Sequence, residues 1–132
     1  MSENLWGTLP KPDSVRTPLF LLREQAEILT EATQGVLVGT VTTIPQVGSN
    51  LDHYLKIIAP ALNHYSFSVV NVSHGMTVYP VTVIDLAQSM GYEVRDEKTL
   101  KEILKKILSS EAVHKVVGGL LAQSRDAKPT KG

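Results

Sequence analysis

The sequence contains no cysteine, which excludes a disulfide framework, a thiolate zinc site and a thiol nucleophile. It also lacks any apolar run near the ~20 residues that a membrane-spanning helix requires. The N-terminal residues show no basic segment followed by an apolar one, the pattern of a secretory signal. Because the absence of cysteine suits a reducing compartment, we expect a cytoplasmic protein that binds no membrane.

Net charge is absent as well, because 13 basic residues balance 13 acidic ones. A neutral chain has no bulk electrostatic attraction for nucleic acid. Basic residues exceed acidic ones only from Glu93 onward, where the two kinds alternate at distances that pair on a helix. No aromatic residue lies among these lysines to stack on bases. The run indicates a solvated helix face, and we expect no nucleic-acid partner.

Motifs for catalysis and cofactor binding are missing too. The sequence has no phosphate-binding glycine loop and no Gly-x-Ser-x-Gly nucleophile elbow. Its four histidines follow none of the spacings typical of metal ligands; they are His53, His64, His74 and His114. We therefore expect neither a metal nor a cofactor, and no motif identifies an enzyme.

The sequence does predict one domain, since 132 residues are enough for a single core and few for two. Residues 1–17 are expected to form an extended arm, residues 18–124 the domain, and residues 125–132 a polar tail. The only tryptophan, Trp6, lies on the arm. We expect it to contact the body of the protein or a partner chain.

Hydrophobic periodicity predicts an α+β fold. A helix over 18–34 is favoured by Thr17 as a cap, Pro18 in the first turn and Gly35 after the end. Stretches rich in Val, Ile and Thr predict strands, at 36–44, 53–59, 65–72 and 76–84. Their short connections require antiparallel neighbours, hence a meander. A helical turn after Asp85, a brief fifth strand over 92–95, and helices from Asp96 and over 111–123 complete the fold, with the two C-terminal helices on one face.

Strand register was predicted from the second hairpin. A three-residue loop at 61–63 places Leu55 opposite Val69 and Ile57 opposite Phe67, so that apolar residues share a face. The same register places His53 opposite Asn71, with Tyr79 opposite Asn71 from the next strand. These three residues would form a polar row that either orients a small ligand or closes the core with hydrogen bonds.

Charge is unusually scarce in the predicted sheet. Between Val36 and Ile84 the only charged residues are Asp52 and Lys56, whereas a sheet with one wet face normally alternates apolar with charged residues. If the helices cover one face, the other remains neutral; its predicted members include Thr42, Tyr54, Ile58 and Val70. Few monomers expose such a surface. We expect it to contact a second copy of the chain, another protein or a small apolar ligand, with a second copy favoured, unless helices wrap both faces.

Two classes of function remain open at this stage. The first is a non-enzymatic protein-interaction module that acts through the neutral sheet face, most simply as a homodimer. The second is a small-ligand-binding protein, or a minor enzyme, that uses the polar row at His53. An enclosed cavity at His53 would favour the second class, and its absence would favour the first.

Overall fold

Three α-helices and five strands make up the part of the chain that the computed structural model describes, namely residues 2–11, 16–46, 48 and 50–127. In chain order the elements are α1 (Pro18–Ala32), β1 (Val38–Pro45), β2 (Leu51–Ala59), the short 3₁₀ helix η2 (Pro60–Leu62), β3 (Tyr65–His74), β4 (Val81–Asp85), β5 (Met90–Val94), α2 (Glu97–Leu108) and α3 (Glu111–Ala127). The predicted α+β fold is confirmed. Some residues of the predicted arm and tail lie outside the described residues, namely 1, 12–15 and 128–132. The same holds for residues 47 and 49 of the predicted turn.

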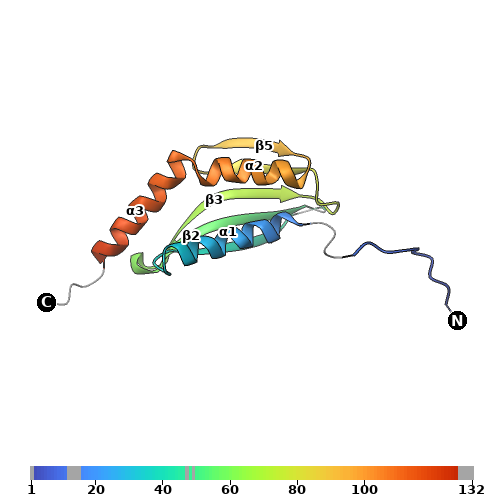
Figure 1. The fold of residues 1–132 in the computed structure, drawn as a ribbon, viewed down its shortest axis with the longest axis horizontal. Helices are drawn as coiled ribbons and strands as arrows, with labels where there is room; N and C mark the ends of the chain where they lie inside the picture. Colours follow the sequence, from blue (N-terminus) through green and yellow to red (C-terminus); the bar gives the residue numbers. More distant parts are fainter. Residues whose placement is uncertain (1, 12–15, 47, 49, 128–132) are drawn as a thin grey trace.

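The strands form one antiparallel sheet in the order β1-β2-β3-β4-β5, which confirms the predicted meander. Helices α1 and α2 lie side by side on the same face of the sheet, with α1 against β1 and β2 and α2 beside β5 (Figure 1). The core lies between this helix layer and the sheet. Its fully buried members include Leu22, Leu37, Val72, Val83, Leu100 and Ile107.

Helix α1 begins as predicted and ends earlier. The Thr17 hydroxyl oxygen accepts a hydrogen bond from the Phe20 N–H at 3.2 Å, and Pro18 occupies the first turn. The helix ends at Ala32 because Gln34 and Gly35 adopt left-handed backbone conformations, with φ of 53° and 81°, which no α-helix continues. The predicted end at residue 34 is therefore two residues too late.

Strand β3 contains one residue, Val69, without a partner in β2. Ile57 pairs with Phe67 as predicted, but Leu55 pairs with Val70 instead of Val69. Side chains alternate between the faces of a strand, so one extra residue reverses the alternation along the rest of β3. The predicted register is correct near the hairpin, where the connection spans 60–64 instead of 61–63, and wrong beyond the bulge.

The chain around β4 also differs from the prediction. The fourth strand begins at Val81 and not at residue 76, because Pro80 has no N–H for a ladder and the preceding segment turns back on itself through Val78, whose φ is 75°. After β4 the Asp85 carboxylate accepts the N–H groups of Ala87 and Gln88 at 3.0 and 3.2 Å. This side-chain turn leads directly into β5, so no short helix follows Asp85.

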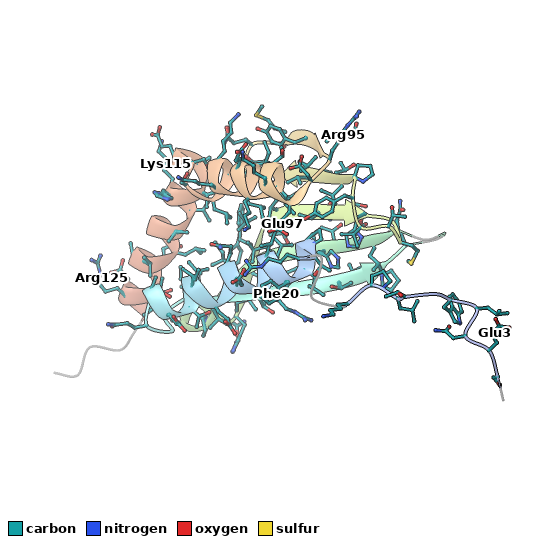
Figure 2. The ribbon with its side chains drawn as sticks, turned by 45° about the vertical axis from the view of Figure 1, so that its right-hand side comes forward. Glu3, Phe20, Arg95, Glu97, Lys115 and Arg125 are labelled. Carbon is teal, nitrogen blue, oxygen red and sulfur yellow. The ribbon has the colours of Figure 1, made fainter. Side chains whose placement is uncertain are left out.

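Helices α2 and α3 form where their patterns predict them. The Asp96 carboxylate caps α2 by accepting the Thr99 N–H at 2.7 Å, and this bond lowers the pKa of Asp96. Helix α3 continues to Ala127, beyond the predicted end at residue 123. It runs from the end of α2 toward η2, and Lys115 and Arg125 lie along it at the margin of the molecule (Figure 2).

Helix α1 and strand β1 touch through their backbones at Gly39. A Cβ atom added there would lie 2.4 Å from the Ala26 carbonyl oxygen and 2.6 Å from its Cα. The Thr30 hydroxyl oxygen accepts the Gly39 N–H at 2.9 Å. No side chain larger than hydrogen fits at this position without moving the helix off the strand.

We therefore predict opposite effects of the same substitution at two glycines. Gly39→Ala should lower the free energy of unfolding by about 3 kcal/mol, because backbone must shift to accept the methyl group. Gly118→Ala, in exposed α3 with open space around the new Cβ, should raise it by about 1 kcal/mol through helix propensity. Urea unfolding followed by circular dichroism measures both. Equal effects at the two positions would contradict the close approach.

Candidate functional site

Two buried histidines contact each other on the helix-covered face of the sheet. His53 on β2 and His74 at the end of β3 are 2% and 8% exposed. Their Nε2 atoms lie 2.8 Å apart, and their ring centroids 4.8 Å. Because His53 pairs with Val72, His74 is its diagonal neighbour on the same face, a position within reach of a long side chain.

The partners of these rings determine where the protons lie. His74 Nδ1 is 2.9 Å from the Gly75 carbonyl oxygen, which only accepts, so this nitrogen carries the hydrogen. In the neutral imidazole, His74 Nε2 is then an acceptor and receives the N–H of His53 Nε2. His53 Nδ1 in turn accepts the hydroxyl hydrogen of Thr43, at 2.8 Å. The three side chains form one satisfied chain of hydrogen bonds that ends on the backbone.

Charge is disfavoured at this position. The pKa of His53 lies below its ordinary value of 6.5, first because of burial and then because of the adjacent His74. Arg23 on α1 lowers this pKa further, whereas Asp52 opposes the shift. Adding a proton at His53 Nδ1 would require the Thr43 hydroxyl to change from donor to acceptor. Burial and the neighbouring ring therefore favour the neutral form of His53 in the core.

The predicted polar row does not form. Asn71 pairs with Tyr54 and Ile84 on the opposite face from His53, since the bulge at Val69 reverses the alternation, and its side chain reaches only the His53 backbone oxygen, at 3.3 Å. Tyr79 lies in the loop before β4, where its hydroxyl donates to the Arg16 carbonyl oxygen at 3.3 Å. Burial, followed by Glu97 and Asp96, raises the pKa of Tyr79 to about 12.

The face of the sheet opposite the helices is nearly free of charge. By register and alternation, β1, β2 and β3 present Thr40, Thr42, Ile44, Tyr54, Ile58, Ser66, Ser68, Asn71 and Ser73, and β4 presents Thr82 and Ile84; these residues are called the open face below. The same alternation adds Val38 on β1 and three charged residues, Asp52 and Lys56 on β2 and Glu93 on β5. The prediction is wrong for Val70, which is completely buried on the helix side because the bulge places it opposite Leu55.

Three cavities lie in the helix layer, away from His53 and His74. One of about 460 Å³ lies between α1 and α2, one of about 250 Å³ is framed by all three helices, and one of about 560 Å³ lies between α3 and the β2–β3 hairpin. None of these three cavities is lined by His53, Asn71 or Tyr79. Trp6 contacts none of them either, and its side chain is 80% exposed on the arm.

No family model, curated protein or solved structure matches this chain. Across the described residues, no helix is long and apolar enough to cross a membrane. Among those same residues no three His, Asp or Glu side chains are grouped as metal ligands would be.

Sequence reasoning identified His53 and missed its two partners. Thr43 pairs with His53 across the β1–β2 ladder. A predicted register for the first hairpin would have shown this pairing. The predicted strand over 65–72 ends before His74, and the bulge that returns His74 to the face of His53 leaves no mark in the sequence. The Gly75 carbonyl oxygen, which orders the whole chain of bonds, belongs to the backbone and has no residue signal.

The buried pair predicts a stability that depends on pH. The unfolded chain protonates His53 as the pH falls below about 6.5, whereas the folded protein does so only at lower pH. The stabilisation is therefore complete above pH 6.5 and is lost as the pH falls through the lowered pKa. Within that window the free energy of unfolding should fall by as much as about 1.4 kcal/mol per pH unit.

Urea unfolding at a series of pH values from neutral downward measures this slope. His53→Gln should reduce it, since the group that binds the proton is gone. His114→Gln, at an exposed position on α3, is the matched control and should leave the slope unchanged. A wild-type slope that survives in His53→Gln would show that other groups are responsible.

Proposed function

We propose that this protein is a protein-interaction module that self-associates through its open face. The observation that carries the proposal is the neutrality of that face, which no helix of the described chain covers (Figure 1). Ile44 and Ile84 are 43% and 36% exposed on it, and threonines and serines fill most of the other positions. Apolar and hydroxyl side chains of this kind are inexpensive to remove from water when another surface pairs with them.

The two charges on β2 favour a second copy as the partner. Asp52, Tyr54 and Lys56 follow one another on the same face of the strand. A two-fold axis between two stacked sheets, perpendicular to β2 and level with Tyr54, places Asp52 of each copy against Lys56 of the other. The face is then self-complementary in charge as well as in polarity, as an isologous interface requires.

Ligand binding at His53 is the less favoured alternative. Both imidazoles already have partners for their ring nitrogens, so neither offers a free donor or acceptor. The cavities described above lie elsewhere. This supports a structural role for the pair.

We predict that Ile58→Asp separates the dimer while the chain remains folded. An unpaired carboxylate in a buried contact costs about 3 kcal/mol, which raises the dissociation constant more than roughly 100-fold. Light scattering on the purified protein at micromolar concentration gives the mass. Ile28→Asp, the same change at an exposed position of α1, is the control and should stay dimeric. A monomeric wild type would refute the proposal.

We also predict that the two charges on β2 compensate each other. Asp52→Lys alone places like charges together across the axis and should weaken the dimer by roughly tenfold or more. The double variant Asp52→Lys, Lys56→Asp restores opposite charges and should recover most of the wild-type affinity. Analytical ultracentrifugation measures the series. Lys56→Asp alone completes the set. If the double variant is weakened by as much as the two single variants together, Asp52 of one copy does not face Lys56 of the other.

A further inference from the structure

The helix layer contains an apolar well above the centre of the sheet. The second half of α1, the end of α2 and the start of α3 frame it (Figure 1), and buried residues of β2 and β3 form its floor. The apolar residues that line it are Ile28, Leu29, Ala32, Leu55, Ile57, Val69, Leu108, Val113 and Val117. Its volume is about 250 Å³. An apolar cavity of roughly 150 Å³ already binds benzene, so this well can hold an alkyl chain.

A more polar cleft of about 460 Å³ adjoins the well and lies between α1 and α2. The cleft and the well share Gln25, Leu108 and His114 as lining residues, so they are direct neighbours. An apolar cavity joined to a few polar groups is the usual form of a small-molecule site.

The charges of the cleft favour an anion. Glu24 pairs with Arg16 at 3.8 Å, and Lys101 with Glu97 at 3.2 Å. Lys105 has no carboxylate within ion-pair distance among the described residues. Lys105 lines the cleft together with His114, whose ring offers a further hydrogen-bond donor. A carboxylate between them gains a cation that has no carboxylate partner among the described residues.

We infer that the well and the adjoining cleft together bind a straight-chain anionic amphiphile, with the alkyl chain in the well and the carboxylate at Lys105. The site lies on the helix side of the sheet, and the open face is on the other. The ligand-binding inference and the proposed dimer can therefore be refuted independently. Ligand titration tests the first, and the oligomeric mass tests the second.

Isothermal titration of the full chain with octanoate and decanoate tests the inference. We expect one molecule bound per chain and an affinity that rises roughly tenfold between the two acids, because each buried methylene contributes to binding. Decanol and decylamine, which have no anion, should bind more weakly than decanoate. Absence of saturable binding, many molecules per chain, or equal affinity for the three decyl compounds would overturn the inference.

Variants locate the two halves of the site. Val117→Phe should reduce decanoate affinity by roughly tenfold or more by filling the well, and Gly118→Ala, one residue further along α3, should not.

Lys105→Gln should weaken decanoate by roughly fivefold and leave decanol unchanged. Lys106→Gln is its control, because that ammonium lies 5.4 Å from the Tyr92 ring outside the cleft. Should Val117→Phe fail to fold by circular dichroism, Ala32→Phe, at the exposed end of α1, replaces it. Full decanoate affinity in the folded well variant, or in Lys105→Gln, would overturn the assignment.

Discussion

Val69 has no partner in β2, and that unpaired residue determines the face of every β3 side chain after it. It turns Val70 into the core and Asn71 onto the open face. It also returns His74 to the side of the sheet where His53 lies, so that the two rings meet at 2.8 Å. An unbulged β3 would place His74 outside and remove the acceptor that His74 Nε2 supplies to His53 Nε2, and a buried donor without a partner costs free energy. The contact between the two histidines and the place of Asn71 on the open face thus depend on the same backbone irregularity.

The elements themselves were predictable because their signals are local. Thr17 and Asp96 cap helices, and short loops between Val- and Ile-rich stretches allow only an antiparallel meander. The bulge was not predictable, because Val69 and Val70 are adjacent valines and either one satisfies an inward position. Because the position of the bulge could not be predicted, the residue of β3 that contacts the His53 ring could not be assigned. Residue type indicated that His53 was special, but the neighbours that explain it come from the register.

The two faces of the sheet differ in their side chains and in their surroundings. On the helix side, valines and leucines are packed against α1 and α2, and the rings of His53 and His74 complete their hydrogen bonds within the chain. On the open side, threonines and serines keep the surface compatible with water, while the scarcity of lysine and glutamate leaves it able to pair. Charge is concentrated instead on α2 and α3, whose outer faces meet solvent. This division supports separate roles for the two sides of the molecule.

The sequential order of the strands has a consequence for how the chain folds. Every strand pairs with its neighbour in sequence, so each hairpin closes a short loop at little entropic cost, and sheets of this kind form faster than those with distant pairings. The contact between α1 and α2, in contrast, joins the two ends of the domain and must wait for the whole sheet. Folding should therefore end with the assembly of the helix layer, and partial unfolding should begin there.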